Sequence, residues 1–316
     1  MLLYAGIASL CSFKYSGLNA TVKKLKQWSL SAGSPQIFRI LKVTSETLRN
    51  SAESISENIK NISIHVPTHL RPLNDTQLGH YLAGLIDGDG HFSSKQQLVI
   101  VFDSRDVKLA YYLKKVLCNG RVKKVKNKNA YLLIISNKNG ILRVLNLING
   151  KLRITNKFNQ VINNILTNSK YSEESISFSM NKTNDFNNHW IAGFSDADAS
   201  FQIKFVEKKD RPKPEIRLNF QIDQKDNDVL LLIKEVFGGN IGYRGSQDTY
   251  YYGSTSFGAA KKVIRYFDVY HLQSSNYINY LKWRKVYLLV QDRAHLTESG
   301  LTKIRSIKNS MSRDSA

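Results

Sequence analysis

The chain has 316 residues, of which 42% are hydrophobic and 10% aromatic, so it can build one large folded domain or two ordinary ones, and wholesale disorder is disfavoured. Its 46 Lys and Arg outnumber its 25 Asp and Glu, and the net charge of +21 favours a polyanionic partner, either nucleic acid or an acidic membrane surface. No apolar stretch approaches the ~20 residues of a membrane-spanning helix, which argues against a membrane protein. Two cysteines, Cys11 and Cys118, are too few for a disulfide framework or a zinc site, so a reducing interior or an organelle matrix fits.

The first 73 residues differ from the rest of the chain. They are rich in Ser, Asn and Thr, and their apolar residues follow no sustained period. Val66–Pro72 is expected to be an extended connector, because proline disfavours helix on its N-terminal side. The opening ten residues lack a basic region ahead of them and make a poor secretory signal. We expect residues 1–73 to form a poorly structured leader with a short helix around 44–60, or else a small DNA-contacting arm.

The charge excess is concentrated in one part of the chain. Residues 91–186 hold 17 Lys and Arg against 5 Asp and Glu, with a dense run at 121–128. A single basic run is usually just a solvated face, but a whole lobe of this charge favours contact with phosphate.

From residue 74 onward the sequence contains an internal repeat. The two copies share the pattern His-aromatic-apolar-Ala-Gly-apolar-x-Asp-small-Asp-small-x-Phe, at His80–Phe92 and His189–Phe201. In both halves the copy leads to an acidic segment, an apolar-periodic helix and a later hairpin. These are Phe102–Asp106, a helix ending at Val116–Leu117 and the hairpin Arg121–Ser136 in the first half, and Ile222–Asp226, a helix ending at Val236–Phe237 and the hairpin Ile241–Ser254 in the second. The expected fold class is therefore α+β: two pseudo-symmetric αββαββα halves, at residues 74–183 and 184–316.

Each copy of the motif is expected to be a helix that packs on the other copy. Cap-type residues precede both, at Asn74–Thr76 and Asn184–Asp185. Glycine inside a helix costs ~1 kcal/mol relative to alanine, so Gly84 and Gly193 need a compensating role, and close approach of two helix backbones would supply one. Such pairing would bring the C-terminal ends of the helices together.

The paired helix ends would place Asp89 near Asp198. Two carboxylates at adjacent helix C-termini repel each other and the macrodipole, and a pair of divalent cations such as Mg²⁺ would relieve the repulsion. Two such ions can activate water and stabilise a leaving oxygen in phosphodiester hydrolysis. Asp87 and Asp196 are better interpreted as structural groups that bond neighbouring backbone.

Two simpler interpretations of the motif remain. An Asp-Gly-Asp-Gly string is usually a plain turn, although two copies in one context weaken that interpretation. A calcium loop would need glycine at its sixth position, where Phe92 and Phe201 stand.

Alternating strands carry a second prediction. One face of Ser200–Val206 and Glu215–Ile222 is apolar, and the other presents side chains able to read base edges in a major groove. A solvated strand face is the alternative, but it usually favours Thr, Glu and Lys. The expected DNA-contacting residues are Gln202, Lys204, Arg217, Asn219, Gln221 and Arg244 in the second half, and Lys95, Gln97, Arg121 and Lys123 in the first.

At this point the sequence closely resembles the LAGLIDADG homing endonucleases in their single-chain, two-motif form. Leu82–Gly90 matches the motif that gives the family its name almost letter for letter, whereas Ile191–Ala199 departs from it at Ser195 and Ala199. The resemblance covers about residues 74–316. It implies a saddle whose sheets follow the DNA major groove, and a monomeric, metal-dependent enzyme that makes a double-strand break at one long site.

The resemblance also implies roles for particular residues. Asp89 and Asp198 would be the catalytic acids, backbone carbonyls at Gly88 and Ala197 would help to hold Mg²⁺, and Gln224 would order a water molecule. Ser104 stands at the matching place in the first half, so the two pockets would cut the two DNA strands unequally. The basic residue usual near such a site could be any of Lys151, Arg153, Lys282, Arg284 and Lys285.

Family members are commonly encoded in organellar group I introns, which implies a mitochondrial or other organellar origin and would explain the leader. The main rival function is an RNA maturase that assists splicing of a group I intron, alone or beside cleavage. Intact acids at Asp89 and Asp198 favour cleavage, since a pure maturase has no chemical need for them. A non-catalytic DNA-binding regulator and an unrelated basic structural protein are further rivals, and the second leaves the repeat unexplained.

Overall fold

The structure is a computed structural model and describes residues 61–172, 174, 176–209 and 212–311. The helix expected around residues 44–60 lies outside the described residues. Within them, no helix is both long and apolar enough to cross a membrane.

The first half runs helix, hairpin, helix, hairpin, helix, as expected. Its strands form one antiparallel sheet of order β1-β2-β4-β3. The elements are α3 (Asp75–Asp89), β1 (Gly90–Ser93), β2 (Gln97–Asp103), the 3-10 turn η2 (Ser104–Asp106), α4 (Val107–Val116), β3 (Arg121–Lys124), β4 (Ala130–Ile135), α5 (Lys138–Ile148), α6 (Thr155–Val161), the π-helical turn η3 (Ile162–Leu166) and α7 (Ser169–Ser172).

The second half repeats this order, and its sheet has the equivalent order β5-β6-β8-β7. The elements are α8 (Trp190–Asp198), β5 (Ala199–Val206), β6 (Glu215–Gln224), α9 (Asp228–Phe237), β7 (Asn240–Arg244), β8 (Thr249–Ser254), α10 (Phe257–Phe267), α11 (Asn276–Gln291), the 3-10 turn η4 (Ala294–Leu296) and α12 (Glu298–Ser310). The doubled α+β fold is thus confirmed.

Alternation along the strands separates a core face from an outer face in each sheet. Leu98 and Ile100 of β2 are buried, as are Leu218, Phe220 and Ile222 of β6. Successive strand residues point to opposite faces, so the residues between them form the outer face. The helices cover the apolar face. On the polar face of β5 and β6, Lys204 is exposed and Gln202 and Gln221 are half-buried, whereas Asn219 is only 3% exposed.

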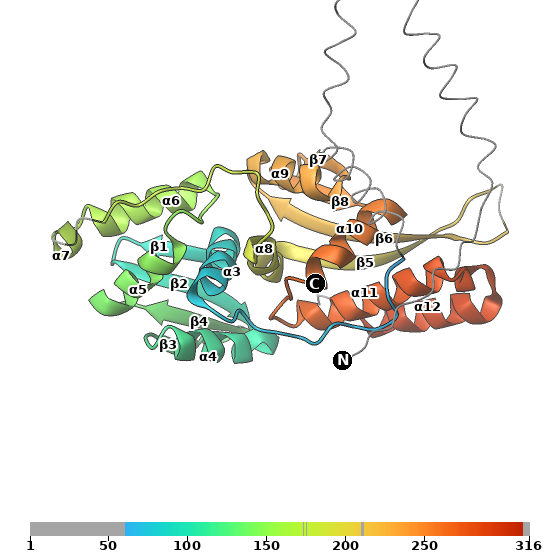
Figure 1. Cartoon of the computed structure of the whole chain (residues 1–316), viewed down its shortest axis with the longest axis horizontal. Helices are drawn as coiled ribbons and strands as arrows, with labels where there is room; N and C mark the ends of the chain where they lie inside the picture. The colour runs from blue at the N-terminus through green and yellow to red at the C-terminus, as the bar shows by residue number, and fades with distance from the viewer. Residues whose placement is uncertain (1–60, 173, 175, 210–211, 312–316) are drawn as a thin grey trace, which may run out of the picture. The chain divides into compact units, whose positions relative to one another are not determined.

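The two motif helices meet backbone to backbone, and Figure 1 shows α3 and α8 side by side where the halves join. A Cβ added at Gly84 would lie 2.0 Å from the carbonyl oxygen of Trp190, and one added at Gly193 would lie 1.9 Å from that of Tyr81. Only glycine permits this approach, so the predicted reason for both glycines is confirmed.

The helices begin differently in the two halves. Asn74 caps α3 as expected, because its side chain accepts a hydrogen bond from the backbone N–H of Gln77 at 2.9 Å. The second predicted cap, at Asn184–Asp185, is wrong. These residues lie in the connector, and α8 begins later, where Asn188 Oδ1 accepts from the N–H of Trp190 at 2.9 Å. Helix α8 is therefore shorter than α3, with 9 residues against 15.

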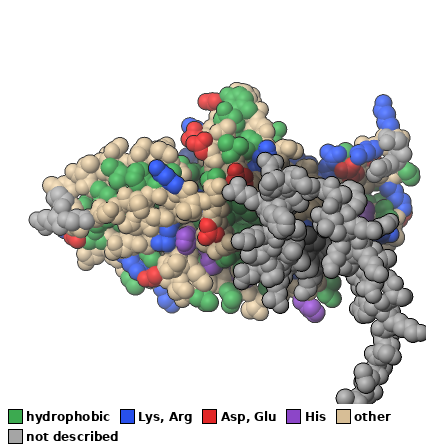
Figure 2. Space-filling view, turned by 45° about the horizontal axis from the view of Figure 1, so that its top comes forward, with side chains coloured by type: hydrophobic (Ala, Val, Ile, Leu, Met, Phe, Trp, Pro, Cys, Tyr) green, Lys and Arg blue, Asp and Glu red, His purple; other side chains and the backbone are tan. Residues whose placement is uncertain are grey.

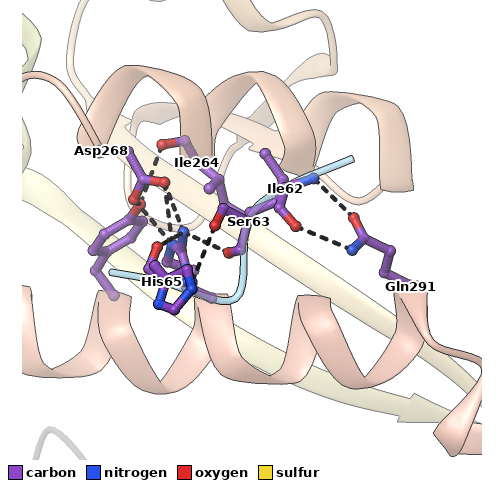
Figure 3. Close-up of polar contacts among 8 residues, drawn as sticks. Ile62, Ser63, His65, Ile264, Asp268 and Gln291 are labelled. Atoms are coloured by element: carbon purple, nitrogen blue, oxygen red, sulfur yellow. Dashed lines mark hydrogen bonds and ion pairs between the residues drawn. The ribbon is translucent and has the colours of Figure 1, made fainter. Parts of the chain in front are cut away.

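Residues 61–73, which we call the strap, precede α3 in sequence but are bound by the second half of the chain. Gln291 pairs with both backbone groups of Ile62, at 3.0 and 3.1 Å. The Arg284 guanidinium donates to the carbonyl oxygens of Ser63 and His65 at 3.0 and 3.1 Å. Figure 3 shows these contacts, and in Figure 1 the blue segment that leads into α3 runs along the second half.

Candidate active site and nucleic-acid interface

The C-terminal ends of the motif helices lie against each other. A Cβ at Gly88 would come within 2.3 Å of Ala197 Cβ and 2.7 Å of an Asp198 carboxylate oxygen. The charge of Asp89 is one of the causes that raise the pKa of Asp198, so the two carboxylates lie close enough to interact. Asp89 and Asp198 are therefore brought together, as the repeat predicted.

Two inner aspartates fix these helix ends. Asp87 accepts hydrogen bonds from the backbone N–H groups of Arg153 and Ile154, at 2.8 and 3.3 Å, and from the indole N–H of Trp190 at 2.9 Å. Asp87 is 1% exposed, so it is a buried structural group.

Asp196 repeats this pattern in the second half. It accepts from the backbone N–H groups of Gln273 and Ser274, at 2.6 and 3.2 Å, and from the Tyr81 hydroxyl at 2.8 Å. Each inner aspartate thus makes two kinds of hydrogen bond. One kind is to the backbone that follows the third helix of the same half, α5 or α10, and the other is to an aromatic side chain of the opposite motif helix. The structural role predicted for both is confirmed.

Desolvation raises the pKa of both candidate catalytic acids, Asp89 and Asp198. Desolvation raises the pKa of Asp89 to about 6, although its side chain reaches solvent. Desolvation, together with the negative charge of Asp89, raises the pKa of Asp198 to about 7. An acid pair whose charges are costly in the free protein is a strong candidate for a cation site.

Gln224 lies at the second acid, as predicted. Its side-chain amide Nε2 donates to Asp198 Oδ2 at 2.6 Å. It stands at the last residue of β6, where the inward side of the strand reaches the end of α8. In this position its amide can orient both the carboxylate and a water molecule beside it.

Lys157 is a basic residue at the site that sequence reasoning missed, and Lys225 lines the same cavity. The Lys157 ammonium donates to the carbonyl oxygen of Gly90 at 2.5 Å and lowers the pKa of both Asp89 and Asp198. It lines one cavity together with Gly88, Asp198 and Gln224. Lys157 follows Arg153 and Ile154 closely in the sequence, and this position is the only sequence feature that could have pointed to it. The hydrogen bonds that the backbone of Arg153 and Ile154 donates to Asp87 are what show that this segment packs against the first motif helix.

The five basic candidates from the sequence have other partners or positions. The guanidinium of Arg153 stacks 4.0 Å from the Phe186 ring centroid and donates to the carbonyls of Thr183 and Asp185, while that of Arg284 is fixed by Asp268 and the strap. Lys282 bonds the carbonyl of Ser310, Lys151 bonds that of Asn149, and Lys285 is exposed on α11. The prediction that one of them serves the acids is therefore wrong.

The two pockets at the acids are unequal. Gly90 pairs with Ile100 and Ala199 pairs with Ile222, so the register makes Phe102, two residues beyond Ile100, the counterpart of Gln224. The match of Ser104 with Gln224 is wrong, because Ser104 has already left the strand and begins η2.

The donors to the first-strand carbonyls also differ. Asn276 donates to Ala199 at 3.2 Å, where the other half has Lys157 donating to Gly90. The cavity at Asp89 is thus lined by Phe102 and Asn276, and the cavity at Asp198 by Gln224 and Lys157.

The six polar residues predicted on the second sheet share its outer face. Lys204 pairs with Arg217 and Gln202 with Asn219 across β5 and β6. The Asn219 amide donates to Gln202 at 3.1 Å and to Gln221 at 3.3 Å. Arg244, from β7, joins them through Asp223, and Arg217 is paired with Glu215 at 2.8 Å. The face is a bonded network of amides, cations and the carboxylates of Glu215 and Asp223.

The first sheet is less polar on its outer face. Arg121 and Lys123 are exposed on β3, Gln97 is half-buried on β2, and Lys95 is exposed in the turn between β1 and β2. Val101, on the same face of β2, is 39% exposed. In the view of Figure 2, Lys and Arg are scattered over the visible surface, so the charge excess does not form one continuous patch there.

A model of the LAGLIDADG endonuclease family matches residues 82–167 and 191–287, which together exceed half of the chain. The chain belongs to this family. The two matched regions each start in a motif helix and end beyond the second hairpin, so they correspond to the two halves of the structure. The LAGLIDADG motif is thus present twice, once in each half.

Relatives of this LAGLIDADG chain are encoded in introns. It is 58% identical over 318 residues to an uncharacterized 37.2 kDa protein of cox1 intron 2 from Schizosaccharomyces pombe, covering 96% of this chain and 95% of that protein. It is 28% identical over 272 residues to the intron-encoded DNA endonuclease aI3 of Saccharomyces cerevisiae, covering 70% of this chain and 65% of that protein.

Solved structures share the LAGLIDADG fold. The chain matches the homing endonuclease I-SmaMI bound to cleaved DNA with a TM-score of 0.59 and 22% identity, covering 80% of this chain and all of that one. It matches the meganuclease I-AabMI bound to uncleaved DNA with a TM-score of 0.59 and 20% identity, covering 74% of this chain and 99% of that one. At these identities the likeness establishes the fold.

LAGLIDADG endonucleases use divalent metals. The acids of this chain suit a site in which the protein supplies only part of the ligand shell of the ion. Within the described residues, no group of three or more His, Cys, Asp or Glu side chains is arranged to hold a metal. Mg²⁺ is often bound by one or two carboxylates, with water and substrate phosphate completing its shell. The pair Asp89 and Asp198 fits that kind of site, in which the substrate supplies ligands.

Proposed function

We propose that this chain is a site-specific endonuclease that hydrolyses one phosphodiester in each strand of a long, asymmetric double-stranded DNA target. The observation that carries the proposal is the meeting of Asp89 and Asp198 at glycine-packed helix ends, beside a strand face of Gln, Asn, Lys and Arg. The two sheets would lie along the major groove as a saddle. Both acids come from one chain, so we propose that a monomer cuts both strands.

Mg²⁺ is the proposed cofactor, held by Asp89, Asp198, the carbonyl oxygens of Gly88 and Ala197, and the DNA. When bound, it would lower the pKa of a water nucleophile and offset charge on the leaving oxygen. Gln224 would hold that water by its amide while it bonds Asp198. Lys157 would place a positive charge beside the phosphate.

The relative named for cox1 intron 2 supports an origin in an organellar intron, and we propose a mitochondrial one. The target would then be the host gene junction without its intron. The proposed function is tested by incubating the protein with a plasmid that carries this junction, with Mg²⁺ or with EDTA. Site-specific linearisation that needs Mg²⁺ and is abolished in the Asp89→Asn/Asp198→Asn double variant supports the proposal. Specific binding without cleavage contradicts it.

Cleavage is expected to need more Mg²⁺ at low pH. The raised pKa values, about 6 for Asp89 and about 7 for Asp198, mean that each acid holds a proton until the pH exceeds these values. A proton and a cation compete for the same carboxylate, so lowering the pH from about 8 to about 6 weakens metal binding. Mg²⁺ titrations of the cleavage rate at the two pH values measure the shift. An unchanged half-maximal Mg²⁺ concentration would contradict it.

Lys157→Met is expected to slow cleavage by about tenfold to a hundredfold, because a fixed charge near the phosphate is lost. The same change removes a cation that lowers the pKa of both acids, so the pH profile should move to higher pH. Lys151→Met is the matched control, since its ammonium bonds the carbonyl of Asn149 at 3.4 Å. Equal losses in the two variants, without a shift of the profile, would show that Lys157 serves only the fold.

A further inference from the structure

Arg244, Asp223 and Tyr251 form a cluster on the outer face of the second sheet, on the three adjacent strands β7, β6 and β8. Arg244 Nη1 donates to Asp223 Oδ1 at 3.0 Å, and its guanidinium carbon lies 4.7 Å from the Tyr251 ring centroid. The Arg244 side chain remains 34% exposed. A guanidinium carries five N–H donors, so the bond to Asp223 leaves donors for an external partner.

Gly242 provides the space for the aromatic ring. It pairs with Tyr251 between β7 and β8. A Cβ at Gly242 would come within 2.4 Å of Tyr251 Cζ and 2.5 Å of its hydroxyl oxygen. The ring therefore lies across the glycine, and any side chain at position 242 would push it from the place where it supports Arg244.

The cluster is adjacent to the candidate active site. Asp223 and Gln224 are neighbours on β6, and successive strand residues point to opposite faces. Gln224 reaches inward to Asp198, while Asp223 reaches outward to Arg244. Asp223 nevertheless lines the same cavity as Asp198 and Gln224, so Arg244 is held beside the candidate active site.

The Arg244 guanidinium, held by Asp223 and Tyr251, is better suited to bind a base edge than a phosphate. Arginine bonds guanine O6 and N7 in a bidentate manner, and this is the commonest specific contact in the major groove. Asp223 offsets the charge of Arg244 and would repel a phosphate, but it leaves the guanidinium fork oriented. We propose that Arg244 reads a guanine close to the cleaved bond, with Asp223 and Tyr251 as its positioning residues.

This inference rests on the proposed DNA cleavage and is tested on the same junction. Each base pair of the half-site under the second sheet is randomised singly, and the cleaved molecules are sequenced. The wild-type chain is expected to prefer guanine at one position near the cut, by about tenfold to a hundredfold. Arg244→Ala should abolish the preference at that position alone, and Arg244→Lys should not restore it because an ammonium has no fork.

The positioning residues are tested at the same position. Asp223→Asn and Gly242→Ala should weaken the same guanine preference and leave the preferences elsewhere intact. Gly258→Ala, on α10, is the control, because a Cβ there meets nothing within 4 Å. Unfolding temperatures of all variants separate a loss of reading from a loss of fold.

Two outcomes would overturn the inference. If Arg244→Ala slows cleavage equally for every base at every position, Arg244 contacts phosphate, and the proposed endonuclease function stands without a guanine reader. If the wild-type chain cleaves no member of the library, the proposed function fails, and the guanine reader fails with it.

Discussion

Asp198→Asn is expected to lower the rate of double-strand cleavage by about a thousandfold, which corresponds to about 4 kcal/mol of transition-state stabilisation. The amide is nearly the same size as the carboxylate but cannot supply the negative charge that a divalent cation needs. Because Asp198 shares its cavity with Gln224 and Lys157, the change removes the acid from the better-equipped of the two pockets.

Asp89→Asn and Asp198→Asn should differ in their residual nicking activity. Asp89→Asn impairs the pocket that has Phe102 in place of the glutamine, so the protein should still nick one strand, and Asp198→Asn should nick more slowly. End-labelled duplexes report which strand is cut and how fast the nicked intermediate appears. Asp292→Asn, at an exposed carboxylate after α11, is the control. Equal nicking of both strands by either variant would contradict the inequality of the pockets.

Gly193→Ala is expected to destabilise the protein by about 3 kcal/mol. The added Cβ would lie 1.9 Å from the carbonyl oxygen of Tyr81 and 2.9 Å from the backbone nitrogen of Leu85, and both are backbone atoms of a buried helix. Alanine gains ~1 kcal/mol over glycine in helix propensity, but forcing two packed backbones apart costs more, so the loss wins.

Urea denaturation of Gly193→Ala beside Gly258→Ala measures this effect. The control lies in α10 with open space at its Cβ, so it should be at least as stable as the wild type, with a gain of up to ~1 kcal/mol from helix propensity. The helix ends carry the acids, so Gly193→Ala should also lose cleavage activity under conditions in which it stays folded. A variant as stable as the control would show that the helices can separate at little cost.

The central fold could be predicted because the same sequence pattern occurs in both halves of the chain. Small residues at Gly84 and Gly193 require a close helix partner, and the strict alternation in β5 and β6 assigns each residue to a face. Both patterns involve residues close together in the sequence, so they can be recognised without the structure.

The rest of the site depends on contacts between distant segments. Lys157 reaches the acids because Asp87 bonds the backbone at Arg153 and Ile154, and nothing in the letters around Lys157 indicates that bond. The counterpart of Gln224 was misassigned to Ser104 for a related reason. The acidic segments align by sequence, but the strand pairing matches Ile100, and not Phe102, with Ile222, so the sequence alignment is displaced by two residues.

The strap imposes an order on folding. Ile62 is bonded by Gln291, 229 residues later in the chain, and Ser63 by Arg284, 221 residues later. Chains fold domain by domain as they leave the ribosome, at about 5–20 residues per second. The first half can therefore complete its sheet while the strap still lacks its partners, and the strap can close only when α10 and α11 have been synthesised. The segment of the strap that is made first is thus among the last to find its native contacts.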